Sequence, residues 1–478
     1  MTSRITASNF TDTDNSPETQ KPSRGKRIAV GTVLGLGLVI AVVFAIMGKQ
    51  AGLWGLVPIV VYSVLALLSV DVVLATAAAL LVATVMSRTG PLALGAQLAT
   101  SLGSFVAVIG MIIMMGAGLG RVAQETGAAQ LLVRVLMQKI GLSTSNRVQV
   151  GIMVASWVLV GALGTLAGAN AILAPIVIPV AARMKWRPPA VAAMLHAAGA
   201  AGLMTGPFTP PVVTIMAATK ISYADYLLKA GLPVAAVTVI TGFFMVKWIQ
   251  RHVDSEYSAA DAASENTDGL PKSANRAAVT FVGALLVMTI YGIVGKAPYS
   301  FALVVMIVTA ALTGLAGRKN PKQTLEAIYA GAGRFIWLFL LFWMLDPLLT
   351  LIGKTGAYEA VFTALQPVTS HVGPWLFLML ILGIGYLHAV PGAAVAQVVL
   401  VNKLFAPVVV GLGIPPAVWA LEMLGISQID QLGPTPGADM IGQMGLARSD
   451  NLKMMLFNGW SIMVTNTVLF AVMFAVFG

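Results

Sequence analysis

Three acidic side chains near the end of the chain lie inside or beside a strongly apolar stretch, residues 417–447: Glu422, Asp430 and Asp439. An ionisable residue in such surroundings is costly and therefore indicates a functional site. Burial disfavours the charged form of a carboxyl group, so one of them could carry a proton at neutral pH. Asp430, three residues before Gly433, is the preferred carrier, and an ion pair with Lys403 is the structural alternative. Asp346 lies in another apolar stretch, where we expect a structural role.

Two runs rich in glycine and proline interrupt long apolar stretches, at residues 206–211 (GPFTPP) and 433–437 (GPTPG). Glycine and proline both disfavour a continuous helix, and proline lacks the backbone N–H. A broken helix leaves N–H groups that attract anions and carbonyls that can bind cations. We therefore predict a binding site beside the two breaks.

Glycines and polar side chains near these breaks, and near the middle of two further interrupted stretches, are the candidate ligands of a solute. Hydroxyl and amide groups suit the oxygens of a carboxylate or a sugar acid, and capping of the broken helices is their structural alternative. The candidates in the first half are Thr165, Gly168, Asn170, Thr205, Gly206 and Thr209. Those in the second half are His388, Gly392, Gln397, Asn402, Gly433 and Thr435. His196, on an apolar helical face, is expected in the core.

The composition indicates that these residues lie in a membrane. The chain has 478 residues, of which 58% are hydrophobic and 10% charged, whereas soluble domains have about 25% charged residues. This excludes an ordinary soluble enzyme, a disulfide-built secreted module and a disordered protein. The net charge of +11 is attributed to Lys and Arg beside membrane spans, so no nucleic acid is expected. Without cysteine, and with four histidines in no metal-ligand spacing, no cofactor or metal site is expected beyond a coupling H⁺ or Na⁺.

Apolar windows predict about eleven membrane-spanning helices, near residues 28–48, 54–70, 72–87, 104–120, 190–220, 228–250, 278–294, 299–317, 335–353, 417–447 and 454–477. Two further stretches, 147–183 and 373–411, are interrupted and too long for one crossing of about 30 Å. We predict that both are re-entrant hairpins. Residues 1–27 are expected to form a disordered cytoplasmic tail, and 28–48 an uncleaved first transmembrane helix.

An internal repeat is indicated by three short markers that recur in the same order: TGA at 126–128 and 355–357, PPAV at 188–191 and 415–418, and GP at 206–207 and 433–434. The first copy is predicted to span residues 50–250, with the hairpin 147–183. The second spans 278–478, with the hairpin 373–411, and a polar cytoplasmic linker, 251–277, joins the two.

Basic residues predict the orientation of the two copies. Both ends of 147–183 carry several Lys and Arg and should be cytoplasmic, whereas 373–411 has none at either end and should enter from outside. The copies would then be inverted, with a cytoplasmic N-terminus and an external C-terminus. The prediction is an all-α polytopic protein of the bacterial inner membrane, in which two re-entrant hairpins and two broken helices belong to inverted halves. Such discontinuous helices are typical of the binding site of a secondary transporter.

Three segments, residues 118–130 (GLGRVAQETGAAQ), 206–211 and 217–227 (AATKISYADYL), resemble the gluconate permease family. That family belongs to the ion transporter superfamily, which includes citrate and C4-dicarboxylate carriers and sodium/proton antiporters. The resemblance implies a scaffold, a moving transport domain that holds both hairpins and both broken helices, an elevator-like movement and a homodimer. The hairpin turns lack the Ser-Asn-Thr signature of the dicarboxylate carriers, which argues against dicarboxylate chemistry.

The resulting expectation is a proton- or sodium-coupled symporter of a small organic anion, with the lipid bilayer as its other partner. The alternative is a cation/proton antiporter of the same superfamily, in which Asp430 and Asp439 would bind the cation. An enzyme is disfavoured because no paired carboxylates, Ser–His couple or metal cluster gathers on one pair of helices. A channel is disfavoured because hairpins that close from opposite sides suit alternating access better than an open pore.

Overall fold

The computed structural model of the chain describes residues 24–48, 50–141, 143–263, 269–295, 297–369, 372–387 and 394–478. These ranges contain helices and no strand. Nine helices or pairs of consecutive helices within them are long and apolar enough to cross a membrane. The predicted all-α membrane fold is therefore confirmed. The predicted tail is outside the described residues up to position 23, and the first helix begins at Arg24 rather than at residue 28.

The first half of the chain forms α1 (Arg24–Met47), α2 (Val57–Leu67), α3 (Val72–Met86), α4 (Pro91–Ser101), α5 (Phe105–Glu125), α6 (Ala128–Ile140), α7 (Ser145–Leu163), α8 (Leu166–Arg183), α9 (Pro188–Thr205), α10 (Pro210–Thr219), α11 (Tyr223–Tyr226) and α12 (Leu232–His252). After the short α13 (Ala259–Ala263), the second half forms α14 (Ala274–Val294), α15 (Phe301–Ala316), α16 (Pro321–Ala332), α17 (Ile336–Lys354), α18 (Ala357–Thr369), α19 (Pro374–Leu387), α20 (Ala394–Gly411), α21 (Pro416–Ser427), α22 (Ile429–Leu432), α23 (Ala438–Leu446) and α24 (Leu452–Phe477).

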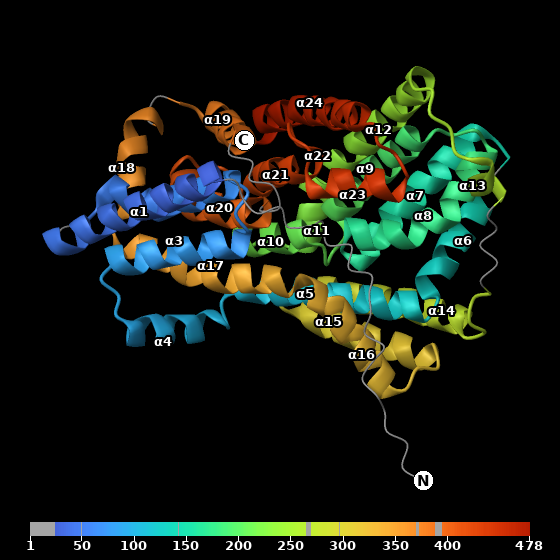
Figure 1. Cartoon of the computed structure of the whole chain (residues 1–478), viewed down its shortest axis with the longest axis horizontal. Helices are drawn as coiled ribbons and strands as arrows, with labels where there is room; N and C mark the ends of the chain where they lie inside the picture. The colour runs from blue at the N-terminus through green and yellow to red at the C-terminus, as the bar shows by residue number, and fades with distance from the viewer. Residues whose placement is uncertain are drawn as a thin grey trace, which may run out of the picture.

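The helices pack into two groups. The scaffold group comprises α1–α5 and α14–α17, in which α5 and α17 pack against each other and against α3, α15 and α16. The carrier group comprises α7–α12 and α19–α24, with α9 packed between α7 and α12, and α24 packed against α12 and α21. In Figure 1 the scaffold group lies mainly along the lower side and the carrier group above it. The helices α6 and α18 link the groups, each at the end of a long scaffold helix.

The order of elements is similar in the two halves. In each half a long helix, α5 or α17, ends at a TGA motif, whose glycine is left-handed: φ is 74° at Gly127 and 78° at Gly356. A short helix, a pair of helices and an interrupted helix then follow in both halves. Left-handed backbone favours glycine because a Cβ is strained there. This parallel order is consistent with a repeat, and the inverted orientation of the halves stays a prediction.

The interruptions lie at the glycine- and proline-rich runs. The helix α9 ends at Thr205 and α10 begins at Pro210, while α22 ends at Leu432 and α23 begins at Ala438. Between α7 and α8 the chain turns at Gly164, where φ is 74°, and at Thr165. Each of these two helices is long enough to cross a membrane by itself, so a re-entrant path for 147–183 stays a prediction. In the second stretch, residues 388–393 between α19 and α20 lie outside the described residues.

Short helices are the elements that hydropathy windows did not predict. The helices α4 and α16 each begin with a proline in the first turn, and Asn320 and Gln323 form a capping box at the start of α16. They are shorter and more polar than a spanning segment. The linker is also shorter than predicted, because α12 extends to His252 and α14 begins at Ala274. The neighbouring spans α2 and α3 are separate helices, since Asp71 caps α3 by accepting hydrogen bonds from Val73 N (3.0 Å) and Leu74 N (3.1 Å).

Candidate functional site

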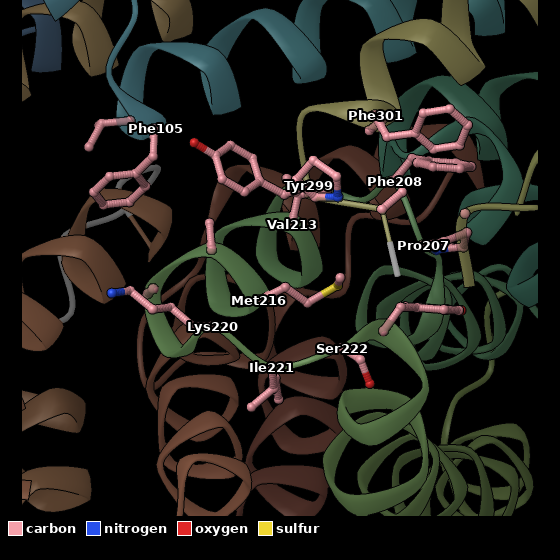
Figure 2. A pocket seen from close by; sticks show the side chains of 18 of the residues that line it. Phe105, Pro207, Phe208, Val213, Met216, Lys220, Ile221, Ser222, Tyr299 and Phe301 are labelled. Carbon is pink, nitrogen blue, oxygen red and sulfur yellow. The ribbon is translucent and has the colours of Figure 1, made fainter. Parts of the chain in front are cut away.

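A pocket of about 970 Å³ lies between the scaffold group and the carrier group. On the carrier side it is lined by the first break, the second half of α10, α11 and α20. On the scaffold side it is lined by the first residues of α5 and by α14, α15 and α17. Figure 2 shows Phe105 and Lys220 on one side of the pocket and Pro207 and Phe301 on the other. Its volume falls in the range of ligand sites.

The first break reaches the pocket because the sequence prevents α9 and α10 from joining. Pro207 and Pro210 lack N–H groups, and a Cβ at Gly206 would collide with the carbonyl oxygen of Gly161 on α7. Thr209 Oγ1 donates to the carbonyl oxygens of Leu203 (2.6 Å) and Gly206 (2.9 Å). Thr209 therefore satisfies carbonyls at the break, while Pro207 and Phe208 line the pocket.

Four charged side chains line the pocket: Lys220, Asp225, Asp346 and Lys403. Asp225 is paired with Lys229 at 2.9 Å and accepts a hydrogen bond from Ser222 at 2.7 Å. Within the described part of the chain, neither Lys220 nor Lys403 forms an ion pair, and Lys403 Nζ lies 5.9 Å from the ring centre of Tyr358. With Asp225 neutralised by Lys229, two lysines face a single carboxylate, that of Asp346. The charge of the lining therefore favours an anion.

These pocket residues differ from the sequence-based candidates. Asp346, for which we expected a structural role, lines the pocket, and the two lysines were not proposed as ligands. A lysine inside an apolar stretch indicates a functional site. The position of Lys403 within the stretch 373–411 could therefore have identified it from the sequence. Among the predicted ligands Asn402 lines the pocket, and its Oδ1 accepts a hydrogen bond from Trp419 Nε1 at 2.9 Å.

The other first-half candidates lie within the carrier group. Asn170 is 0% exposed, and its side chain joins three further helices. Its Nδ2 donates to Leu195 O (3.1 Å) and Gln443 Oε1 (2.7 Å), and its Oδ1 accepts from Ser156 Oγ at 2.8 Å. Thr205 Oγ1 donates to Ala201 O at 2.9 Å and accepts from Trp157 Nε1 at 2.8 Å. Thr165 stands at the turn between α7 and α8 and Gly168 in the first turn of α8, and both are outside the pocket lining.

The second-half candidates are dispersed. Gln397 Nε2 donates to Gly385 O at 3.0 Å. Gly433 directly follows α22, and Thr435 at the second break is exposed, whereas Thr209 at the first break is buried. Glu422 is buried on α21, and Asp439 lies in the first turn of α23. His388, Gly392 and the side chain of Asp430 lie outside the described residues.

Buried polar side chains hold the carrier group together across the two halves of the chain. His196 on α9 lies in the core, where its Nε2 contacts Gln431 O at 2.8 Å and its Nδ1 contacts Asn458 Nδ2 at 3.4 Å. Asn466 Nδ2 on α24 donates to Gln428 Oε1 (2.7 Å) and to Thr238 Oγ1 on α12 (2.9 Å). Together with the bonds of Asn170, these contacts fix both broken helices in one body.

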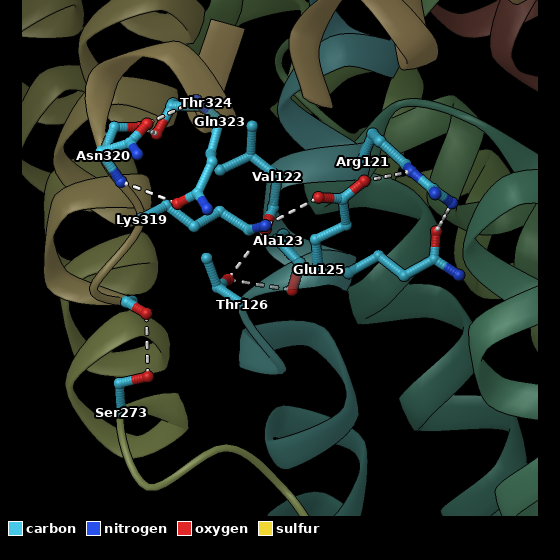
Figure 3. A network of polar contacts seen from close by, with 12 residues as sticks. Arg121, Val122, Ala123, Glu125, Thr126, Ser273, Lys319, Asn320, Gln323 and Thr324 are labelled. Atoms are coloured by element: carbon cyan, nitrogen blue, oxygen red, sulfur yellow. Dashed lines mark hydrogen bonds and ion pairs between the residues drawn. The ribbon is translucent and has the colours of Figure 1, made fainter. Parts of the chain in front are cut away.

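The scaffold group has its own polar contacts. Figure 3 shows Glu125 at the end of α5 between Arg121 and Lys319, at 2.8 Å from each. Trp343 Nε1 on α17 donates to Leu98 O on α4 at 2.7 Å. Among the described residues, no hydrogen bond or ion pair joins a helix of the scaffold group to a helix of the carrier group. Across the pocket, however, Lys403 on α20 and Asp346 on α17 are close enough to interact electrostatically.

No curated protein compared with the chain matches its sequence. The family described as CitMHS, citrate transporter, has a sequence model that matches residues 63–423. Among solved structures, the YdaH transporter of Alcanivorax borkumensis is similar, with a TM-score of 0.58 and 18% identity. The match covers 80% of this chain and 89% of that chain, and at this identity it shows the fold alone. The described residues contain no group of three or more His, Asp or Glu side chains that could hold a metal ion.

Proposed function

The chain belongs to the citrate transporter family, and from that premise we propose that it is a secondary transporter that carries citrate-like anions across the membrane. The proposal includes symport with H⁺ or Na⁺, an elevator-like movement and the homodimer that the family resemblance implies. It also includes a bacterial inner-membrane location, with the N-terminus in the cytoplasm and the C-terminus outside.

The observation that carries the proposal is the pair of lysines in the pocket between the two groups. Lys220 ends α10 in left-handed backbone, with φ at 57°, and Lys403 lies on α20. Both belong to the carrier group, and an ammonium group is a point charge that binds a carboxylate without demanding one orientation. Two such charges suit an anion with more than one carboxylate, and the low dielectric of the membrane strengthens their attraction.

The elevator-like movement is supported by the distribution of polar contacts. The carrier group is joined internally by buried side chains such as Asn170 and Gln443, at 2.7 Å. The pocket lies on the boundary between this group and the scaffold group. Since no hydrogen bond among the described residues joins the two groups, the carrier group can move along this boundary without breaking one, and it would carry the lysines with it. A bound anion could thereby face first one side of the membrane and then the other.

The test is uptake of radiolabelled citrate into proteoliposomes that contain the purified protein. Lys220→Met and Lys403→Met should each raise the KM for citrate about ten- to hundred-fold, which corresponds to loss of one contact to a charged group. Lys322→Met is the matched control, because Lys322 is an exposed residue of α16 whose Nζ lies 3.9 Å from Glu326. Its KM should equal that of the wild type. Absence of citrate uptake and exchange in the wild type, or an unchanged KM in both pocket variants, would contradict the proposal.

A further inference from the structure

The carboxyl group of Glu422 is buried and has no hydrogen-bond partner among the described residues. Glu422 lies on α21 and is 0% exposed. Within the described part of the chain, neither Oε1 nor Oε2 accepts or donates a hydrogen bond. A carboxylate in such a place would lose its hydration and gain no compensating donor, so ionisation of this group in this conformation is costly.

Among the described residues, the titratable groups on the helices around α21 do not provide a counter-ion. Tyr386 on α19 is close enough to interact electrostatically with Glu422, but it is neutral, and its hydroxyl pairs with Thr467 Oγ1 at 2.9 Å. The helix α10 has no titratable side chain before Lys220, and the side chain of Asp430 on α22 lies outside the described residues. The others on packed elements are Lys403 on α20, Lys453 on α24, Tyr223, Asp225 and Tyr226 on α11, and Lys229, which is paired with Asp225. None of these forms an ion pair with Glu422 in the described part.

Glu422 lies on a helix that packs against the end of α19 and leads to the second break. One helical turn later, Ile426 packs so closely on Gly385 of α19 that a Cβ at Gly385 would collide with it. Gly385 stands just before α19 ends at Leu387, and α21 leads through α22 to the second break at Gly433. Glu422 is outside the lining of the pocket. The carboxyl group therefore lies between the second helix pair and the second break, apart from the lysines that face the anion.

We propose that Glu422 binds the proton that is co-transported with the anion, an inference that rests on the proposed function. The carboxylate takes up a proton from water on one side of the membrane and forms an O–H bond. The same O–H bond breaks on the other side and returns the proton to water, with no change of oxidation state. Glu422 and the two lysines belong to the same carrier group, so the proton and the anion are linked through the movement of that group rather than by direct contact. The sequence pattern favoured Asp430 for this role, and its side chain lies outside the described residues. The proposal for Glu422 rests on the burial of its carboxyl group.

The experiment compares wild type, Glu422→Gln and Glu326→Gln in proteoliposomes. Glutamine has the shape of the protonated acid but cannot release a proton. Glu326 is a control because it is an exposed acid of α16 in the scaffold group. Three quantities are measured. Exchange of radiolabelled citrate is followed without any gradient, whereas citrate accumulation and lumen acidification, the latter reported by a trapped pH-sensitive dye, are followed with an alkaline lumen.

We expect Glu422→Gln to keep citrate exchange, whereas its citrate accumulation and lumen acidification should each be at least ten-fold lower than in wild type. Glu326→Gln should behave as wild type. Glu422→Asp, which keeps an acid, should recover part of the accumulation and guards against a folding defect in the glutamine variant. Accumulation and acidification at wild-type levels in Glu422→Gln would overturn the inference, as would wild-type accumulation that needs a sodium gradient instead. Loss of exchange in a folded Glu422→Gln protein would make the residue structural and also overturn it. In all these outcomes wild type exchanges citrate, whereas failure of the proposed function itself would abolish that exchange.

Discussion

Replacing Asn170 with alanine distinguishes a ligand of the solute from a side chain that holds the carrier group together. The sequence left both roles open for this residue. In the structure its amide makes hydrogen bonds of 2.7 to 3.1 Å with Ser156, Leu195 and Gln443 on three other helices. The residue is outside the pocket lining. We therefore expect Asn170→Ala to reduce stability first, and the apparent affinity for the solute little.

The magnitude follows from the groups left behind. Each net hydrogen bond contributes about 1 kcal/mol, and a buried group that loses its partner costs about 1–3 kcal/mol. Gln443 Nε2 already has no hydrogen-bond partner among the described residues, so removal of Asn170 leaves both ends of that amide unsatisfied. Hydrogen bonds between membrane helices average somewhat less, about 0.6 kcal/mol. For three bonds we expect a loss of about 2–4 kcal/mol in the free energy of unfolding.

The assay is unfolding of the purified protein by titration with sodium dodecyl sulfate, with citrate exchange measured in parallel. Gln443→Ala alone should cost about 1–2 kcal/mol, and the double variant should cost less than the sum of the two, by about 1 kcal/mol, because the two amides share a bond. Thr435→Ala is the control, since it removes an exposed polar side chain at the second break. The reasoning would be refuted if Asn170→Ala left stability unchanged and raised the KM.

Three further predictions concern the breaks, the scaffold and the topology. Thr209→Val should cost about 1 kcal/mol of stability because Leu203 O loses its hydroxyl donor, whereas Gly206 O keeps the backbone N–H of Thr209 at 3.2 Å. Thr435→Val, at an exposed position of the second break, should cost none; equal losses in denaturant unfolding would contradict this. Glu125→Gln weakens the contacts with Arg121 and Lys319. Because these side chains are 21–33% exposed, we expect the free energy of unfolding to fall by about 0.5–1 kcal/mol. The difference from wild type should disappear when unfolding is measured at high salt. In a chain without cysteine, Gly413→Cys should react with a membrane-impermeant thiol reagent from outside and Lys185→Cys from the cytoplasm; reaction of both from the same side would exclude the inverted repeat.

Hydropathy and the positions of glycine and proline were enough to locate most of the apolar spans. Apolar windows identified α2 and α3 as separate spans, and Gly206–Pro211 and 433–437 marked both interruptions, since hydropathy and the missing N–H of proline are local properties. The same windows missed α4, α6, α16 and α18. These helices are short, and two of them begin at the TGA motifs, where the chain passes from the scaffold group toward the carrier group. A hydropathy window detects a segment that crosses a membrane, and it does not detect a helix that only connects two bodies.

Which side chains share a site depends on the packing of helices that are distant in the sequence. The sequence indicated that Asn170, Thr209 and Glu422 lie in apolar surroundings, but Asn170 meets a partner 273 residues away, Gln443, and Thr209 bonds to carbonyls of its own break. Lys220 and Lys403 come from different halves and line one pocket. The face that a helix turns toward its neighbours depends on how distant helices pack, and spacing along one helix carries no information about a partner on another. Local chemistry therefore fixed the helices and their breaks, whereas packing between the two groups determined that two lysines, rather than the polar groups at the breaks, line the pocket.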